Sequence, residues 1–228
     1  MKNHKQEIFE KKFSDNYRPG LIEKLAKIFE KYRSDVMLSL IENKKGIFVD
    51  LACGNGDFIV QVSSYYRSLY GFDISKKRIS NAKNKLKDQK KIELKVKDLD
   101  EGIPVKSYSV NTVVCEASLA YFIRPDLLLE EVFRILKPGG EFIVQIGNYA
   151  YLTRRVALFF GNLPKISSFK GFGDGGMIHY FTYFSLKNLL EEKGFEITRK
   201  SNSGVFYGLR KIWPELLSSD IIYRAVKK

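Results

Sequence analysis

Short apolar runs alternate with amphipathic segments from Gly46 to Val226, and this rhythm constrains the fold more than any other feature of the chain. Apolar runs of four to eight residues are typical of strands, and the segments between them carry helical periodicity. Repeated strand–helix–strand units form a mostly parallel sheet with helices on both faces. The expected strands are Ile47–Leu51, Leu69–Phe72, Ile92–Val96, Val110–Cys115, Phe142–Ile146, Phe195–Thr198 and Ile221–Val226. The sequence therefore predicts an α/β fold with a doubly wound, seven-stranded sheet.

The segments between the strands carry signals for helix starts and ends. A serine at the start supplies a side-chain cap, and glycine or proline after the end stops the helix. Ser75 and Ser185 are the expected caps, and Gly194 and the segment Lys137–Gly140 are the expected stops. The expected helices are Asp57–Tyr66, Lys76 to about Lys87, Asp126–Leu136 and a helix that Ser185 caps and that runs through Lys193.

The segment before the sheet is expected to be a helical extension over residues 1–45. Its apolar residues repeat at steps of three and four, which is typical of an amphipathic helix. They are Leu21, Leu25, Ile28, Phe29, Tyr32, Val36, Leu40 and Ile41. We expect this extension to cover an edge or the mouth of the main domain, which then spans residues 46–228.

Length and composition favour one domain with extensions. The chain has 228 residues, of which 44% are hydrophobic, enough for one sizeable core. No apolar run is long enough to span a membrane, and Met1–Lys12 lacks the apolar stretch of a signal peptide, so we expect a cytoplasmic protein. Cys53 and Cys115 have no metal-site spacing and are expected to be small buried residues, with no metal bound.

The sharpest local signal is the segment Val49–Phe58, in which an apolar strand leads to Asp50 and then to a Gly-x-Gly turn at Gly54 and Gly56. Glycine lets a ligand approach the backbone closely, and a helix start offers free N–H groups to an anion. The nicotinamide fingerprint requires a third glycine where this chain has Ile59. The turn therefore favours a cofactor without a pyrophosphate, although any tight strand-to-helix turn can carry two glycines.

Two further acids follow the second and third expected strands. Asp73 lies 17 residues after Gly56, at a place where an acid can accept hydrogen bonds from ribose hydroxyls. Asp98 can accept from an adenine amino group, while the backbone of Leu99 reads the ring edge. Read singly, Asp73 is a helix N-terminal acid and Asp98 a turn residue. As an ordered series with Asp50 they favour a ligand at the carboxyl ends of the strands.

The ordered motifs VDLACGNGDF, GFDIS, KDLDEGIPVKSYSVNTVVCEASLAYF and LLLEEVFRILKPGGEFIV resemble those of the class I S-adenosylmethionine (SAM)-dependent methyltransferases, whose fold is Rossmann-like. The resemblance covers about Gly46 to Phe195. It implies that Asp50, Gly54 and Gly56, with Ala52 beside them, hold the methionine end of SAM. It also implies that Asp73 with Ile74 holds the ribose, that Asp98 and Leu99 hold the adenine, and that Glu116, Ala117 and Ser118 line the reacting centre.

A weaker likeness extends toward the carboxyl terminus. The segments Gly161–Pro164, Met177–Thr182 and Ser185–Phe195 are similar to small-substrate members, among them the methionine-biosynthesis MetW group and the quinone-biosynthesis methyltransferases. Two departures narrow the mechanism. Tyr121 stands where many relatives carry histidine, and Cys115–Ser118 lacks the acid/Asn-Pro-Pro-aromatic motif of adenine and glutamine N-methyltransferases.

An aromatic insertion over residues 149–184 interrupts the rhythm after the fifth strand. Long apolar insertions at this position are often lids over a binding site, and we rank this interpretation above extra core and above a base-stacking surface. Because SAM carries an already activated methyl group, a general base is optional. The candidate bases are His179, Tyr121 and Glu116, with Tyr180 beside them, although His179 is equally explained as a polar lid residue.

The formal net charge of +13 leaves a second function open. Basic proteins often bind nucleic acid, but the lysines are spread along the chain and only Lys83–Lys97 is dense. We expect SAM-dependent methyl transfer to a small, largely apolar acceptor. The alternatives are an RNA methyltransferase and a SAM-binding partner protein without catalysis. The sequence does not fix the oligomeric state.

Overall fold

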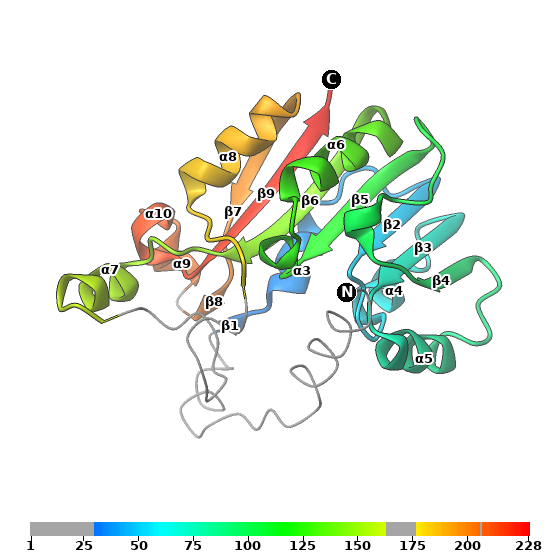
Figure 1. Cartoon of the computed structure of the whole chain (residues 1–228), viewed down its shortest axis with the longest axis horizontal. Coiled ribbons are helices and arrows are strands. Elements are labelled where there is room, and N and C mark those ends of the chain that lie inside the picture. The colour runs from blue at the N-terminus through cyan, green and yellow to red at the C-terminus, as the bar shows by residue number, and fades with distance from the viewer. Residues whose placement is uncertain (1–29, 163–176, 206) are drawn as a thin grey trace.

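The computed structural model describes residues 30–162, 177–205 and 207–228 (Figure 1). These residues form a seven-stranded sheet with the strand order β4-β3-β2-β5-β6-β9-β7. Five neighbouring strands run parallel, and β9 runs antiparallel to β6 and β7. The predicted α/β class with a doubly wound, mostly parallel, seven-stranded sheet is confirmed. The strands are β2 (Ile47–Leu51), β3 (Ser68–Asp73), β4 (Ile92–Val96), β5 (Val110–Glu116), β6 (Leu136–Gly147), β7 (Phe195–Ser201) and β9 (Asp220–Lys227).

The strand order brings the ends of the early strands together. The chain enters the sheet at β2, moves outward through β3 to the edge strand β4, and then crosses back to β5 on the other side of β2. In open parallel sheets such a reversal leaves a crevice outside the carboxyl ends of the central strands. The residues after β2, β3 and β5 therefore share one place at the edge of the sheet.

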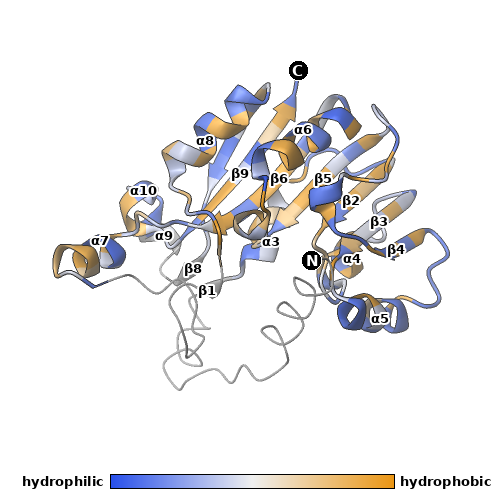
Figure 2. Ribbon diagram, in the orientation of Figure 1, coloured by the Kyte–Doolittle hydropathy of each residue, from blue (hydrophilic) through white to orange (hydrophobic). Residues whose placement is uncertain are grey.

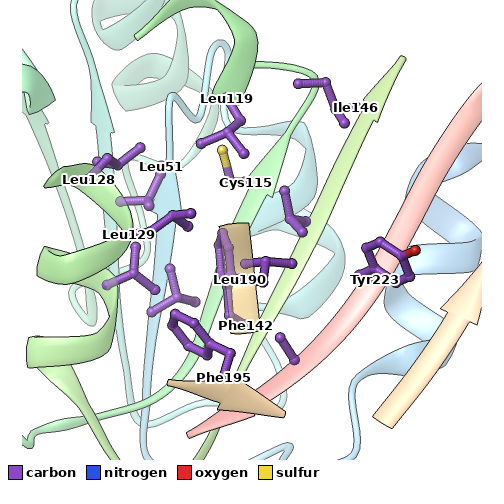
Figure 3. Packing of buried hydrophobic residues seen from close by; sticks show 14 of the residues in the cluster. Leu51, Cys115, Leu119, Leu128, Leu129, Phe142, Ile146, Leu190, Phe195 and Tyr223 are labelled. Carbon is purple, nitrogen blue, oxygen red and sulfur yellow. The ribbon is translucent and has the colours of Figure 1, made fainter. Parts of the chain in front are cut away.

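Helices cover both faces of the sheet, as expected. The helices α6 (Pro125–Ile135) and α8 (Tyr183–Glu192) pack on one face, where Leu128, Leu186 and Leu190 contribute to a buried cluster (Figure 3). The helices α3 (Arg33–Leu40), α4 (Asp57–Val62) and α5 (Lys76–Lys85) pack on the other face. Both cysteines are buried, Cys115 in the first cluster and Cys53 in the second.

The segment before the sheet differs from the predicted helix. Glu30–Lys31 form a short strand, β1, which pairs antiparallel with β8 (Gly204–Val205), and the helix α3 begins only at Arg33. Periodicity within the segment does not reveal a partner that lies so far along the chain. Val36 and Ile41 are buried as expected, whereas the rest of the predicted extension, over residues 1–29, lies outside the described residues.

Three predicted helix boundaries were wrong. The helix α4 ends at Val62, and α6 ends at Ile135, because Leu136 already pairs with Val110 as the start of β6. The segment Lys137–Gly140 therefore lies within this strand, next to a register shift. The cap of α8 is Thr182, because its hydroxyl accepts from the Ser185 backbone while the Ser185 hydroxyl accepts from the Thr182 backbone.

A buried ion pair joins the neighbouring strands β6 and β9. Glu141 on β6 is fully buried and accepts from Arg224 Nε on β9 at 2.7 Å. The same carboxylate accepts from the backbone of Asn43 at 2.8 Å and from the hydroxyl of Thr112 at 3.1 Å. The connection between α3 and β2 is therefore fastened to three strands of the sheet.

The aromatic insertion is partly core and partly exposed. Phe181 and Tyr183 belong to the buried cluster under α8, so the carboxyl-terminal end of the predicted lid is core. The helix α7 (Leu152–Phe159) carries no buried residue among its described side chains. The residues 163–176 at the centre of the insertion lie outside the described part. The short helices α9 (Tyr207–Arg210) and α10 (Pro214–Leu217) follow β8.

Among the helices that the structure describes, none combines the length and the apolar character needed to cross a bilayer.

Candidate functional site

The loop after β2 has the backbone shape that the glycines predict. Gly54 has a φ of 54° and Gly56 a φ of 75°, both in the left-handed region, and Gly56 caps the start of α4. A Cβ built on Gly56 would lie 3.2 Å from Ala82 Cβ, so this glycine also lets α4 approach α5. Ala52 holds a φ of 58° without being glycine. Such conformations cost free energy and concentrate at functional sites.

The Asp73 carboxylate joins this loop to the end of β3. Its Oδ2 accepts a hydrogen bond from Gly54 N at 2.9 Å, and its Oδ1 accepts from Ser75 N at 2.8 Å. Because each carboxylate oxygen has two lone pairs, both oxygens keep capacity for a second donor such as a ribose hydroxyl. Asp73 is only 5% exposed, and the two backbone hydrogen bonds fix the position of its carboxylate. Ile74 follows it in the same turn.

Three acids gather at the carboxyl ends of β2, β3 and β5. Asp50 is 2% exposed, and its pKa is raised well above the ordinary value by burial first and then by the negative charges of Glu116 and Asp73. A buried carboxylate among other acids is stabilised by a cation. The amino and sulfonium groups of SAM are cationic, so the chemistry of this cluster fits the methionine end of that cofactor.

The turn after β4 places Asp98 and Leu99 beside this cluster. Lys97 N donates to the carbonyl of Asp73 at 2.9 Å, which attaches the turn to the end of β3. Asp98 caps the short helix η2 (Leu99–Glu101) by accepting from Asp100 N at 3.1 Å, and Leu99 is buried. The turn interpretation of Asp98 is thus confirmed. Its contact with adenine, which is compatible with this cap, stays a prediction.

The segment after β5 carries the second strained alanine. Ala117 has a φ of 54°, and its N–H donates to the carbonyl of Gln145 on β6 at 2.9 Å. The Ser118 hydroxyl lies 3.1 Å from Cys115 Sγ and 3.5 Å from the carbonyl of Leu51. These contacts fasten the loop to β6 and to β2. The loop thereby lies next to the acid cluster, where the resemblance puts the reacting centre.

Glu116 has a cationic partner that sequence reasoning missed. Arg33, the first residue of α3, donates from Nε to Glu116 Oε1 at 2.7 Å. The Glu116 side chain is 25% exposed, so the pair lies at the surface of the site. The two residues are 83 positions apart, and no local pattern links them. The contact attaches the start of α3 to the end of β5.

The remaining candidates meet in a corner formed by η3 (Leu119–Tyr121) and the end of the insertion. The backbones of Ile178 and His179 both donate to the carbonyl of Ala120, at 2.9 and 3.1 Å. The His179 ring Nε2 lies 3.2 Å from the carbonyl of Ile123. Tyr121 ends η3, and its N–H donates to the carbonyl of Ser118 at 2.9 Å. His179 and Tyr121 therefore both adjoin the loop that follows Glu116.

Aromatic and aliphatic side chains form the outer edge of this corner. The rings of Tyr149 and Tyr180 have centroids 4.6 Å apart, and the backbone of Tyr149 donates to the carbonyl of Phe181. Ile178 is 52% exposed and Tyr180 is 46% exposed. Both ends of the insertion thus lie beside the loop that follows β5.

Asp100, an acid that the sequence analysis did not single out, orders the same region. Asp100 Oδ1 accepts from Ile123 N at 3.0 Å and from Arg124 N at 3.4 Å. The turn after β4 is thereby tied to the loop between η3 and α6. The sequence around Asp100 shows only an acid in a turn, because the backbone partners of its carboxylate come from a different loop.

Similarity to known proteins agrees with this geometry. The model of a family described as methyltransferase domain matches residues 42–165, more than half of the chain. A Dictyostelium discoideum protein named as a methyltransferase is 28% identical over 137 residues, which are 58% of this chain and 49% of that protein. The chain thus spans about half the length of this relative. A demethylmenaquinone methyltransferase of Lactobacillus johnsonii is 26% identical over 202 residues, which are 74% of this chain and 78% of that protein.

The fold is also that of solved structures. A magnesium protoporphyrin IX methyltransferase from Synechocystis, solved with bound S-adenosylhomocysteine, superposes with a TM-score of 0.66 and 15% identity. The superposition covers 97% of this chain and 94% of that protein. With the family match and the acid-and-glycine site at the carboxyl ends of β2, β3 and β5, the chain belongs to the class I, SAM-dependent methyltransferase-domain family.

Proposed function

We propose that this protein transfers a methyl group from SAM to a small, largely apolar acceptor. The observation that supports the acceptor class most is the outer edge of the site. Tyr149, Ile178 and Tyr180 lie beside the loop that follows Glu116, and they offer apolar surface where an acceptor has to approach. The names of the demethylmenaquinone and protoporphyrin methyltransferases agree with such an acceptor.

In this proposal the cofactor is held by residues of three loops. Asp50 faces the cationic methionine end, with Gly54 and Gly56 lining the approach and Ala52 shaping the loop. Asp73 and Ile74 hold the ribose, and Asp98 and Leu99 hold the adenine. When bound, SAM supplies a methyl group that its sulfonium has already activated. The protein's part is to align the acceptor with the methyl–sulfur bond and to exclude water, and positioning alone is worth up to about 7–11 kcal/mol in the best cases.

Three side chains are candidates to receive a proton if the acceptor must lose one. With His179 Nε2 donating to the carbonyl of Ile123, the proton sits on that nitrogen and Nδ1 becomes the basic atom. Glu116 Oε1 accepts from Arg33 Nε at 2.7 Å, so this carboxylate already has a cationic partner. Tyr121 lies in the same loop. His179 is the first candidate base, because its ring orientation is fixed by a backbone acceptor.

The insertion over residues 149–184 is proposed as a cap over the acceptor side of this site. Its two ends contact each other, because Tyr149 N donates to the carbonyl of Phe181, and Ile178 and His179 donate to the carbonyl of Ala120. A segment anchored at these points is well placed to exclude water from the acceptor. Its stacking rings equally suit a base, so an RNA acceptor is the second candidate, and the net charge of +13 is the observation that favours it.

The test of this proposal is transfer of a labelled methyl group from SAM. The full chain is incubated with labelled SAM and, in parallel, with a lipophilic metabolite extract, a water-soluble extract and total RNA. We expect label in the lipophilic extract, and we expect His179→Ala to lower turnover while SAM binding measured by calorimetry stays unchanged. Label at a defined RNA position with none in the extracts would reverse the assignment. SAM binding without label in any arm would favour a partner protein without catalysis.

A further inference from the structure

The helix α7 presents its apolar side to solvent instead of to the core. Leu152, Val156, Phe159 and Phe160 follow one another at steps of four, three and one, so they share one face of the helix. Phe159 is 84% exposed and Phe160 is 71% exposed. In a helix that packs on its own domain, this face is the one that would be buried. Figure 2 shows the apolar colouring of α7 at the outer end of the molecule.

The polar side of α7 is the one that attaches the helix to the body. The Arg154 guanidinium donates to the backbone carbonyl of Asn148, and burial lowers the pKa of Arg154. Arg155, which flanks the apolar face, donates to the carbonyl of Ala150 at 2.6 Å. The two arginines attach the helix to the body of the protein, and these contacts orient its apolar face toward solvent.

A second exposed apolar site lies beside the start of α7. Ile212 is 78% exposed and Trp213 is 58% exposed, at the corner between α9 and α10. This corner contacts the residues before α7, because the guanidinium of Arg210 lies 5.9 Å from the ring of Tyr151 and Asn148 Nδ2 donates to the carbonyl of Glu215 at 3.0 Å. We define the α7 patch as Leu152, Val156, Phe159, Phe160, Ile212 and Trp213.

The charged side chains that the structure describes on α7 are both cations. Arg154 faces the body of the protein, whereas Arg155 is exposed beside the apolar face. Lys211 directly precedes Ile212. The nearest acid on α10, Glu215, is paired with Lys200 at 2.6 Å. The whole chain carries a formal net charge of +13. An apolar face with cations at its flank suits the boundary between headgroups and acyl chains of an anionic bilayer.

We propose that the α7 patch docks this protein on an anionic lipid surface. Aromatic rings at the interface and cations toward the headgroups are the two contributions that hold peripheral proteins to membranes. The patch lies at the carboxyl end of the sheet, and the ring of Tyr149, three residues before α7, packs against the ring of Tyr180 at the edge of the candidate site. Docking there brings the acceptor side of the site toward the lipid. Binding to lipid does not require methyl transfer, so the proposal can be tested separately from the enzymatic one.

The single tryptophan of the chain makes the test direct, because Trp213 lies within the patch. The full chain is mixed with vesicles of phosphatidylcholine alone or of phosphatidylcholine rich in phosphatidylglycerol, and the bound fraction is separated by flotation. We expect binding to the anionic vesicles that weakens with added salt. We also expect a blue shift of the Trp213 emission and its quenching by brominated acyl chains. Binding without quenching would place the contact elsewhere and overturn the proposal.

A double variant, Phe159→Ser with Phe160→Ser, tests the helix itself. Burial of each ring contributes more than about tenfold, so we expect the vesicle affinity to fall at least tenfold. The matched control is Tyr65→Ser, which removes a ring that is 43% exposed before β3, at the opposite end of the sheet. SAM binding measured by calorimetry confirms that each variant is folded. Equal affinity of the double variant and the control would refute the assignment.

Light scattering distinguishes the other occupants of the face. We expect a monomer in the absence of vesicles, with the same mass for the double variant. A dimer that the double variant converts to a monomer would assign the face to a second copy of the chain instead. Failure of the wild-type chain to bind either vesicle would also end the proposal, whatever the result of the methyl-transfer assay.

Discussion

Oδ2 of Asp73 lies 2.9 Å from the backbone nitrogen of Gly54 and accepts its hydrogen bond. One residue ends β3 and the other lies in the turn after β2, so this contact joins the two loops that the sequence assigns to the cofactor. The acid consequently has a structural task besides its proposed contact with ribose. Substitutions in this pair separate the two tasks.

Asp73→Ala is expected to weaken SAM binding by about 1–3 kcal/mol, because it leaves donors of the ribose without an acceptor. The variant also frees Gly54 N and Ser75 N, so a smaller loss of stability is expected. Calorimetric titration measures the first effect and urea unfolding the second. Asp57→Ala is the control, since the Asp57 side chain is 75% exposed and pairs with Lys85 at the surface. An unchanged SAM affinity in Asp73→Ala would remove Asp73 from the cofactor site.

Gly54→Val is expected to abolish SAM binding while the sheet still folds. Among the described residues, a Cβ at Gly54 would meet only Arg78 Nη1, at 3.6 Å, so the sheet has room for a side chain that would block a cofactor. Valine is also strained at the φ of 54° there, and this strain is confined to the loop. Circular dichroism and calorimetry measure the two outcomes.

The contrasting variant for this prediction is Gly71→Ala. A Cβ at Gly71 would lie 2.6 Å from both Ile59 Cδ1 and Leu94 Cδ2, so this variant should lose stability by overpacking, about 1–3 kcal/mol. Wild-type SAM affinity in Gly54→Val would contradict the placement of the loop.

Asp50→Asn is expected to stabilise the protein at neutral pH and to weaken SAM binding. The folded pKa of Asp50 is raised, so the unfolded chain releases this proton first, and the folded state holds more protons above about pH 4. The free energy of unfolding therefore falls as pH rises from there to the folded pKa, and the substitution removes this contribution because an amide does not titrate.

Urea unfolding of both proteins across this pH range tests the expectation. The free energy of unfolding should decline less steeply with pH in the variant than in the wild-type protein. Identical slopes would show that Asp50 is ionised in the folded state without a penalty.

Glu141→Ala is expected to cost about 3–5 kcal/mol of stability, because the guanidinium of Arg224 would stay largely buried with the loss of its closest partner. The exposed partner Glu42 still pairs with Arg224 at 3.0 Å and sets a limit on the loss. Asp126→Asn at the exposed pair with Arg124 is the control and should change stability by less than about 1 kcal/mol. The measurement is denaturant unfolding, and equal effects of the two substitutions would be inconsistent with this account.

The sheet was predictable because its signals are local. The strands around Asp50, Asp73 and Glu116 are short apolar runs, and the glycines and Ser75 mark the turns beside them. Parallel strand–helix units then place their ends at one edge of the sheet. The resemblance to family motifs was needed to assign each loop to a part of the cofactor, because the spacing of the residues alone left that assignment open.

The missed features all depend on distant partners or on contacts that spacing does not show. Arg33 reaches Glu116 across 83 positions, and β1 pairs with β8 near the other end of the chain. The cap of α8 was misassigned by three residues because Thr182 and Ser185 are both good caps, and the reciprocal bonds between them decide which one starts the helix. The exposed face of α7 also escaped, because the same spacing of apolar residues predicts a buried face.

The central claim is that the loops after β2, β3 and β4 form a SAM site, and a calorimetric titration of the full chain with SAM and with NAD tests it most directly. The absence of a third glycine at Ile59 and the buried acid at Asp50 both favour SAM over a pyrophosphate cofactor. The account predicts saturable SAM binding that Asp73→Ala weakens, with proton release as Asp50 gains a cation. Tight NAD binding without SAM binding would contradict it.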